Sequence, residues 1–425
     1  MKNGILKTYN DEKKPTERSG ALFPSVSFVK KNALTVLARA LFGAACIVMN
    51  CKKEKSRLAE KTDGPCLILS THGSLLDAVY AGRSILPKYY TGVVAKNVFL
   101  QPVIGGLVRK MGFIAKKQFV ADIVCIKAIK SALDGGVSVF ICPEGKISAD
   151  GRQGYLSPAI AKLVKWADAP VLFYKTHGSY LAFPRWSKGI RRGKIRVEAS
   201  LLFSKDELRT LSYDDIYERL KTAFVFNDYE YQEQNRLKFR TRRPAEGIER
   251  LLYKCPECGA EFQNLTKKDA LTCSSCGNAV RIDLFGAITS LTGGAFFDRP
   301  DRWADFQKAA LREETARDGF ALSERVVLSV EDVDTAKYVK TAKGTLTLNG
   351  KGLTFSPSEI FRNDIRAEYF YPLSALPSLA FGNKSVYLGA DGAMQSYAFD
   401  GGGKACKWHY AVEILYGGAF GESSA

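Results

Sequence analysis

The sequence predicts an α/β domain with a largely parallel sheet, followed by a small cysteine-rich module and a β-rich C-terminal domain. Up to about residue 226, strand-like apolar runs alternate with helical segments, the order typical of a parallel sheet covered by helices. Four cysteines then stand in two close pairs, and short β-type runs separated by Gly, Asn and Asp follow Glu324. A chain of 425 residues is long enough for two or three domains.

Three strands are expected in the first half, because each is a short apolar run bounded by turn residues. They are residues 66–70, 137–142 and 170–174. The helices expected around them are residues 75–86, 103–111, 127–133 and 159–167. Pro87 and Gly112 follow two of these helices, at positions where proline and glycine commonly end a helix.

The basic charge of the chain belongs to its first half. Residues 1–200 carry 33 Lys and Arg against 13 Asp and Glu, whereas residues 201–425 carry 29 against 31. The partner of the first half should therefore be anionic: a membrane surface, a phosphorylated substrate or nucleic acid. Six of the ten cysteines are scattered through apolar or strand-like runs, which indicates a reduced, cytoplasmic compartment and no disulfide framework.

An apolar run over residues 33–49 follows a polar N-terminal tail, which does not look like a signal peptide. Arg39 lies inside the run and lysines flank both of its ends, a pattern that favours a helix lying in a membrane interface over one that spans the bilayer. The alternative is an ordinary buried helix. The prediction is a protein held peripherally or monotopically on the inner face of the membrane, with an anionic membrane surface as a partner.

A histidine and an aspartate follow the first predicted strand, at His72 and Asp77. On one continuous helix they would lie about 140° apart around the axis. They can meet if His72 lies in the loop and Asp77 in the first helical turn, where Ser74 and Asp77 form a capping-box pattern. A neutral histidine could then take the proton of a hydroxyl that attacks a thioester, with the carboxylate fixing its tautomer. Alternatively, Asp77 merely caps the helix and His72 is an ordinary loop residue.

A second polar turn, with Glu144, follows the strand over residues 137–142. Sites in open α/β sheets gather beyond the carboxyl ends of strands, so His72 and Glu144 could share one cleft. Residues 176–179 repeat the letters THGS of residues 71–74, but no carboxylate stands five positions after His177. His177 is therefore expected to line the site at most, and the buried-strand thiols Cys66 and Cys142 are poor candidates for nucleophiles.

The ordered motifs of residues 30–205 resemble those of the lysophospholipid (1-acyl-sn-glycerol-3-phosphate) acyltransferases. Residues 71–77 (THGSLLD) are similar to the first motif of that family, 142–145 (CPEG) with Ser148 to the third, and 169–171 (APV) to the start of the fourth. The second block is matched by Lys96, Pro102, Gly105, Arg109 and Gly112. The resemblance implies an α/β acyltransferase domain, an acyl-CoA or acyl-carrier-protein donor, a lipid acceptor, and membrane attachment through the N-terminal region.

The resemblance also implies the site residues. His72 and Asp77 would be the catalytic pair, and substrate would be bound by Ser74, Lys96, Lys117, Glu144, Gly145, Lys146 and Arg152. The chain departs from the family pattern where arginines would hold an acceptor phosphate, because Gln118 and Ile147 stand at those positions. Either Lys117, Lys146 and Arg152 replace them, or the acceptor has no phosphate monoester there; the second interpretation is favoured.

The paired cysteines predict a structural metal site. Cys255 with Cys258, and Cys273 with Cys276, form two C-x-x-C knuckles, each followed by glycine. Four thiolates close a tetrahedral Zn²⁺ site with no open position for catalysis, so a zinc ribbon is expected. Zinc ribbons often bind nucleic acid, which gives one alternative function. The near balance of charge over residues 250–284 makes nucleic acid an unlikely partner. A catalytically inactive lipid-binding scaffold is the other alternative.

The β-type runs after residue 321 and a final helical segment loosely resemble pleckstrin-homology-like folds in pattern alone, and a packing or partner-binding role is expected for them. The predicted organisation is a basic tail and membrane-associated helix (1–56), the acyltransferase domain (57–226), a basic linker (227–250), the zinc ribbon (251–284), a linker helix (285–320) and the β-rich domain (321–425). The sequence gives no indication of the oligomeric state.

Overall fold

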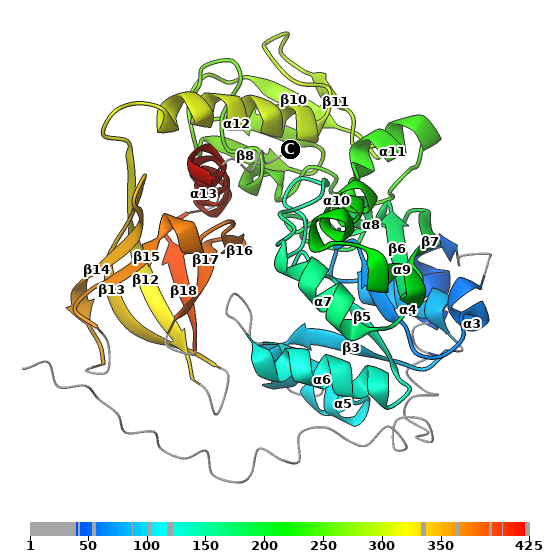
Figure 1. Ribbon diagram of the computed structural model, residues 1–425. Helices are drawn as coiled ribbons and strands as arrows, with labels where there is room; N and C mark the ends of the chain where they lie inside the picture. Colours follow the sequence, from blue (N-terminus) through cyan, green and yellow to red (C-terminus); the bar gives the residue numbers. More distant parts are fainter. Residues whose placement is uncertain are drawn as a thin grey trace, which may run out of the picture.

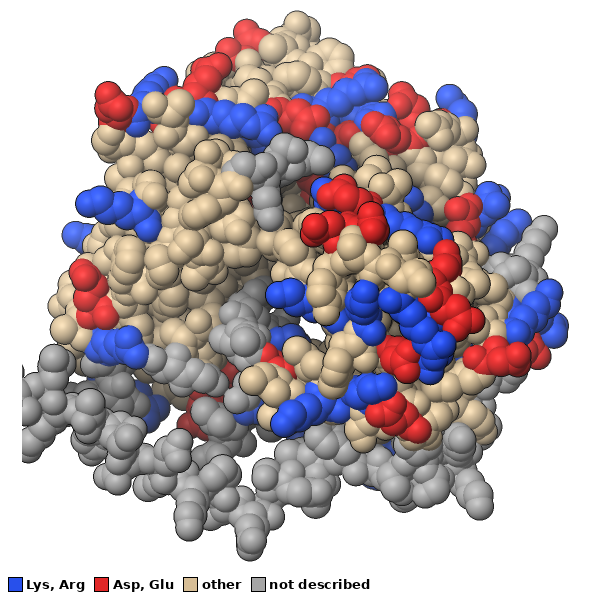
Figure 2. Space-filling view, viewed as in Figure 1, with Lys and Arg blue, Asp and Glu red and all other residues tan. Residues whose placement is uncertain are grey.

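The fold is seen in a computed structural model, which describes residues 40, 43–52, 57–86, 88–100, 104–116, 122–332, 337–362, 366–390, 393–401 and 403–420. The α/β half and the C-terminal sheet lie side by side, and a small sheet with one long helix joins them (Figure 1). The last helix lies between these parts. In the space-filling view the molecule is hollowed between the C-terminal sheet and the α/β half (Figure 2).

The first half contains a seven-stranded sheet in the order β1-β7-β6-β2-β5-β3-β4. Strands β6, β2, β5, β3 and β4 are parallel to one another, and β7 is antiparallel to β6. The largely parallel sheet predicted from the sequence is therefore confirmed. The elements in chain order are β1 (Cys51–Lys52), α3 (Leu58–Lys61), β2 (Leu67–Ser70), α4 (Asp77–Ile85), β3 (Tyr90–Ala95), η2 (Lys96–Leu100), α5 (Ile104–Lys110), β4 (Ile114–Lys116), α6 (Ile123–Asp134), β5 (Ser138–Ile141), α7 (Ala159–Ala167), β6 (Val171–His177), α8 (Ser179–Ala182), β7 (Ile195–Phe203), α9 (Lys205–Thr210) and α10 (Tyr213–Phe224).

The register of the central strands brings the predicted site loops to one edge. Leu69 of β2 pairs with Ile141 of β5 and with Phe173 of β6, so β2 and β5 end at nearly the same level, while β6 continues to His177. The turns that carry His72 and Glu144 therefore leave the sheet side by side, next to the last residues of β6, where the second THGS copy begins. This is the carboxyl edge, where sites of open α/β sheets form.

The basic linker predicted over residues 227–250 is folded. Residues Asp228–Asn235 form α11, and the chain after it is buried at Leu237, Phe239 and Ala245. The prediction of a linker was wrong for a physical reason. Polar and basic residues alternate here with apolar ones, so one side of the segment packs on the α/β half while the other faces water. Composition alone cannot distinguish such a segment from a solvated linker.

The cysteine module is a four-stranded antiparallel sheet in the order β11-β10-β9-β8. It is preceded by η3 (Ile248–Arg250) and consists of β8 (Asn264–Lys267), β9 (Ala270–Cys273), β10 (Ala279–Ile282) and β11 (Ile288–Ser290). Helix α12 (Pro300–Thr315) follows, with proline at its first turn, a position that proline favours. The predicted helix in this region is thus present.

The C-terminal domain is a seven-stranded antiparallel sheet closed by helix α13. Its order is β15-β14-β13-β12-β18-β17-β16, with neighbours antiparallel. The elements are β12 (Ala321–Glu331), β13 (Tyr338–Asn349), β14 (Gly352–Ile360), β15 (Tyr369–Pro372), η4 (Leu373–Ala375), β16 (Ala380–Phe381), β17 (Ser385–Ala390), β18 (Ala393–Phe399) and α13 (Lys404–Phe420). A β-rich domain ending in a helix is confirmed, whereas its likeness to pleckstrin-homology-like folds stays a prediction.

One hydrophobic core runs through all three parts. It includes Tyr174 of the first sheet, Trp303 of α12, Leu346 of the C-terminal sheet and Trp408 of α13. Residues 405–412 of α13 are all buried, as expected of a helix that is covered on every side. A second core, between the first sheet and helices α6, α7 and α10, stays within the α/β half. The accessory parts are therefore packed against the α/β half and are not loosely attached to it.

The predicted membrane-associated run lies mostly outside the described residues. Of that run, residues 43–48 are helical, with Cys46 buried and Ile47 and Val48 exposed. Among the described helices, none has both the length and the hydrophobicity that crossing a bilayer requires.

Candidate active site

His72 and Asp77 meet at the carboxyl edge of the sheet. His72 lies in the loop after β2 and Asp77 is the first residue of α4, and the distance from His72 Nδ1 to Asp77 Oδ2 is 3.3 Å. The Asp77 side chain is fully buried, whereas 23% of the His72 side chain is exposed. The buried carboxylate can hold the proton on Nδ1, which leaves Nε2 as a base. The loop-plus-first-turn arrangement expected from the five-residue spacing is present.

The Asp77 carboxylate accepts hydrogen bonds from two groups besides His72. Its Oδ2 accepts a hydrogen bond from the Ser74 backbone N–H at 2.8 Å, and its Oδ1 accepts one from the Thr176 hydroxyl at 2.9 Å. The capping-box pattern is only half formed, because the Ser74 hydroxyl accepts from Leu76 N–H and Asp77 itself begins the helix. Ser74 is fully buried, so its hydroxyl shapes the turn. Its placement does not support the prediction that Ser74 binds substrate.

The second THGS copy contributes to the site through residues other than its histidine. Strands β2 and β6 are neighbours, so Thr71 and Thr176 lie beside each other with hydroxyl oxygens 3.3 Å apart. A Cβ added at Gly73 would stand 2.7 Å from the Ser179 hydroxyl oxygen, so glycine is required for this close packing. The sequence interpretation missed Thr176 and Ser179. The repeat itself was the signal, since equal motifs after neighbouring parallel strands meet in space.

His177 points away from the pair formed by His72 and Asp77. Its Nε2 lies 3.2 Å from Glu198 Oε2 on β7, and its ring stacks on Tyr231 of α11 with centroids 4.1 Å apart. Burial lowers the pKa of His177 although Glu198 acts in the opposite direction. His177 thus packs at the sheet edge without reaching His72 through any described contact.

Glu144 fixes the backbone around His72. Its Oε1 accepts a hydrogen bond from the His72 N–H at 3.0 Å and its Oε2 accepts one from the Gly154 N–H at 2.6 Å. The Ser148 N–H donates to the His72 carbonyl at 2.8 Å. Burial raises the pKa of the Glu144 carboxyl, against hydrogen bonds from Gly154 and His72 that lower it. Glu144 was predicted to bind substrate, but both of its oxygens are occupied by backbone donors.

Lys146 and Arg152, also predicted to bind substrate, turn toward the C-terminal half of the chain. Lys146 Nζ lies 2.5 Å from Glu413 Oε1 of α13 and also contacts the Ser378 hydroxyl. Arg152 forms ion pairs with Asp150 at 2.7 Å and with Asp305 of α12 at 2.7 Å. These partners lie far along the sequence, so local patterns could not indicate them. The two cations are neutralised and are not free to hold an acceptor phosphate.

Asp150 is the centre of this contact. Besides Arg152, its Oδ2 lies 3.0 Å from Lys308 Nζ of α12 and accepts a hydrogen bond from the Tyr410 hydroxyl of α13 at 3.4 Å. Burial works to raise the pKa of the Asp150 carboxyl, but Lys308 and Arg152 outweigh it and hold that pKa far below its usual range. Helices α12 and α13 therefore hold residues 142–152, the loop that supports His72.

The remaining predicted site residues are placed as follows. Lys96 begins η2 at the end of β3, on the same edge as His72, and is partly buried. Gly145 has φ +66° and is exposed, so a glycine suits that turn. Lys117 lies outside the described residues. Burial raises the pKa of the Cys142 thiol well above its usual value, which agrees with excluding it as a nucleophile.

The four paired cysteines converge. Their sulfur atoms all lie within 4.8 Å of one another, with 3.8 Å from Cys255 to Cys276 and from Cys258 to Cys273. Tetrahedral Zn–S bonds of about 2.3 Å would separate sulfurs by about 3.8 Å. Gly259 and Gly277 have positive φ, which lets each knuckle turn back on itself. The donor set and its spacing fit a four-coordinate metal.

Comparison with known proteins points to the same half of the chain. Residues 50–172 match the family model described as Acyltransferase. Over 139 residues the chain is 32% identical to "1-acyl-sn-glycerol-3-phosphate acyltransferase BAT2, chloroplastic" of Brassica napus, covering 32% of this chain and 40% of that protein. It is 30% identical over 139 residues to "1-acyl-sn-glycerol-3-phosphate acyltransferase LPAT1, chloroplastic" of Arabidopsis thaliana, covering 32% of this chain and 38% of that protein.

The matched region thus spans about two fifths of the length of these two curated relatives. Among solved structures, the 1-acyl-sn-glycerophosphate (LPA) acyltransferase PlsC from Thermotoga maritima is similar with 14% sequence identity and a TM-score of 0.39. That similarity covers 48% of this chain and 79% of the PlsC chain.

Proposed function

We propose that this chain, whose residues 50–172 match the Acyltransferase family model, transfers an acyl group from a thioester donor, acyl-CoA or acyl-carrier protein, to a lysophospholipid or related lipid acceptor. The observation that carries the proposal is the partly exposed His72 beside the buried Asp77. Such a pair, open on one side only, is suited to proton transfer at a bound hydroxyl. The comparisons do not favour nucleic-acid binding, since both curated relatives are acyltransferases.

In the proposed reaction, His72 acts as the base and Asp77 orients it. Nε2 takes the proton of the acceptor hydroxyl as its oxygen attacks the thioester carbonyl carbon. The new C–O ester bond forms, the C–S bond breaks, and the imidazolium returns the proton to the leaving thiolate. The Asp77 carboxylate stabilises the imidazolium. Glu144 and Ser148 are positioning residues, because their hydrogen bonds with His72 are to its backbone and not to its imidazole ring.

The acceptor proposed here carries no phosphate monoester at the position usual for the family. Lys146 and Arg152, the described cations of the supporting loop, are neutralised by Glu413, Asp150 and Asp305. Among the predicted binding cations that the structure describes, Lys96 at the end of β3 is the one without an ion pair to a described residue. A phosphate in a partly buried cleft would need charge-assisted donors, so a lyso-lipid with a different head group is the better fit.

To identify the acceptor, the release of free thiol from acyl-CoA or acyl-carrier protein is measured with one acceptor at a time. Lysophosphatidate, glycerol 3-phosphate and lyso-lipids without a phosphate monoester are compared at equal concentration. We expect thiol release to be fastest with the lyso-lipids that have no phosphate monoester. A clear preference for lysophosphatidate that is lost in Lys96→Ala would contradict the acceptor proposal and leave acyl transfer intact. No acceptor-dependent release with any lipid would contradict the acyl transfer itself.

We also propose that the four cysteines bind one Zn²⁺ per chain and that the metal is structural. Cys255→Ser should lower the zinc content to near zero and unfold the local sheet, because metal binding supplies much of the folding free energy of such modules. Metal analysis of the purified protein and hydrogen exchange of residues 255–290 measure both effects. Leu265→Ala, an exposed position in the same module, serves as the control. Full zinc loading in Cys255→Ser would contradict the assignment.

A further inference from the structure

The segment after α11 lies against the start of β7 and forms a basic surface there. Arg192 and Arg240 form an antiparallel bridge, with the Arg192 N–H donating to the Arg240 carbonyl at 3.0 Å and the reverse bond at 2.7 Å. Alternate residues of both segments point inward: Ile195 on one, Leu237 and Phe239 on the other. The residues between them therefore point outward. We call the five outward cations the basic ridge: Arg192, Lys194, Lys238, Arg240 and Arg242, all exposed.

Close packing under the ridge fixes this arrangement. The Phe239 ring occupies the space above Gly193, where an added Cβ would stand 2.2 Å from a ring atom. The Phe239 N–H also donates to the Leu284 carbonyl of the cysteine module at 2.8 Å. The ridge thus joins the α/β half to that module, and its side chains are held outward by buried neighbours.

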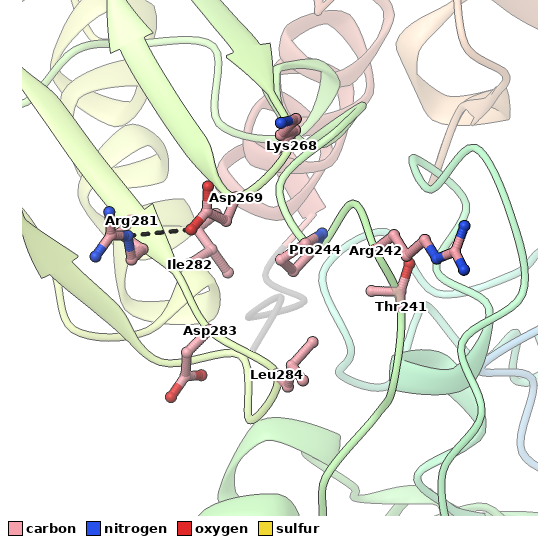
Figure 3. Close-up of a pocket in the computed structure, with 9 residues that line it drawn as sticks. All are labelled: Thr241, Arg242, Pro244, Lys268, Asp269, Arg281, Ile282, Asp283 and Leu284. Atoms are coloured by element: carbon pink, nitrogen blue, oxygen red, sulfur yellow. Dashed lines mark ion pairs between the residues drawn. The ribbon is translucent and has the colours of Figure 1, made fainter.

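The cations of the ridge are not neutralised. None of the five takes part in an ion pair with any described residue. The nearby acidic groups have other partners: Glu246 pairs with Lys188 and Arg243, and Glu198 pairs with Arg196. In Figure 3 the Arg242 side chain extends away from the ion pair of Asp269 and Arg281. On the face seen in Figure 2, by contrast, basic and acidic side chains are interspersed over the α/β half.

Exposed aliphatic side chains stand at the same edge of the sheet. Strand β1 pairs parallel with β7 at Cys51 and Ile195, so the helical residues 43–48 enter the fold beside the ridge. Ile47 is 70% exposed and Val48 56%, and Ile190, just before Arg192, is 49% exposed. Because His177 at the end of β6 pairs with Arg196 of β7, this is also the carboxyl edge, where His72 lies.

From this arrangement we infer that the basic ridge, with Ile47, Val48 and Ile190 beside it, is a docking surface for an anionic lipid bilayer. Unpaired cations next to exposed aliphatic side chains match lipid head groups and the upper acyl chains. The Phe285 ring centroid lies 5.9 Å from Lys238 Nζ of the ridge, but the exposed apolar side chains named above are aliphatic, whereas single-stranded nucleic acid is bound by successive stacked aromatic rings. The inference rests on the proposed function for the identity of the lipid partner and deepens it, because docking on this edge brings His72 to the membrane surface.

Vesicle binding by the full-length protein tests the surface. Phosphatidylcholine vesicles, with and without phosphatidylglycerol, are sedimented with wild type, with Arg192→Glu/Arg240→Glu, and with Arg325→Glu/Lys351→Glu. The last variant changes net charge equally, at exposed positions of the C-terminal sheet. The ridge variant should bind anionic vesicles at least about tenfold more weakly, whereas the control variant binds like wild type. High salt should weaken wild-type binding. Equal thermal unfolding of the three proteins excludes misfolding.

Unchanged binding of the ridge variant, or equal loss in the control variant, would overturn the inference. So would wild-type protein that binds RNA but not anionic vesicles. Transfer to a lyso-lipid dispersed in detergent separates this inference from the proposed function. The ridge variant should retain that activity, since its changes lie outside the catalytic residues. Absence of transfer in wild type would contradict the proposed function, while the vesicle measurements would still decide the docking surface.

Discussion

His72→Ala should lower the rate of acyl transfer by about 10²- to 10⁴-fold, because general-base catalysis contributes a factor in that range. Asp77→Asn should cost somewhat less. In the structure the two oxygens of Asp77 face three donors: His72 Nδ1, the Ser74 N–H and the Thr176 hydroxyl. An asparagine can still accept from His72 and Ser74 through one oxygen, but it carries no negative charge to stabilise the imidazolium that forms during transfer.

The matched control for this prediction is His177→Ala. That histidine stands in the same four-residue motif, after the neighbouring strand, but pairs with Glu198. Initial rates with saturating donor and acceptor, together with zinc content and thermal unfolding, are measured for all three variants. His177→Ala should transfer at the wild-type rate. Wild-type turnover in His72→Ala would contradict the mechanism, and so would an equal loss in both histidine variants.

Asp150→Asn should destabilise the protein by about 3–5 kcal/mol at neutral pH, because it leaves Lys308 and Arg152 buried without their shared carboxylate. The supporting loop would lose its attachment to α12 and α13, so transfer should fall as well. Asp168→Asn is the control: its pair with Lys205 is exposed, Asp168 has φ +49°, and asparagine tolerates that conformation. Urea unfolding followed by tryptophan fluorescence measures both variants, and the control should change by less than about 1 kcal/mol.

The effect of Asp150→Asn should depend on pH. The pKa of Asp150 is lowered in the folded protein, so its contribution to stability is fully present above the ordinary carboxyl range near pH 4 and is lost as the pH falls toward the folded value. The difference between wild type and variant should therefore shrink below about pH 4. A difference under about 1 kcal/mol at pH 7, or one that grows in acid, would contradict this role of Asp150.

Sequence patterns predicted the strands that contain a short apolar run. The runs over residues 66–70, 137–142 and 170–174 correspond to β2, β5 and the buried first part of β6. Strand β7 was missed: it lies near the sheet edge, and exposed Arg196 and Glu198 alternate with buried Ile195 and Val197. Strands β3 and β4 were missed because they are short or contain glycine, as at Gly92. Edge and short strands take their stability from neighbours that a local pattern does not contain.

The contact of His72 with Asp77 could be predicted from the sequence, but most of the contacts that surround this pair could not. The spacing of His72 and Asp77, with the strand before them, defines a local turn, and local turns are visible in sequence. Glu413 stands 267 positions after Lys146, and only the fold brings them together. For the same reason the contact of Thr176 with Asp77 became clear only once β2 and β6 were seen to be neighbours.

The most direct test of acyl transfer is the appearance of a labelled lipid product. Full-length protein is incubated with donor carrying a labelled acyl chain and with extracted membrane lipid, and the lipids are separated. We predict that label enters one lyso-lipid class in equal amount to the thiol released, and that His72→Ala produces neither. Thiol release without labelled lipid, or labelled lipid formed equally by His72→Ala, would contradict the proposed function.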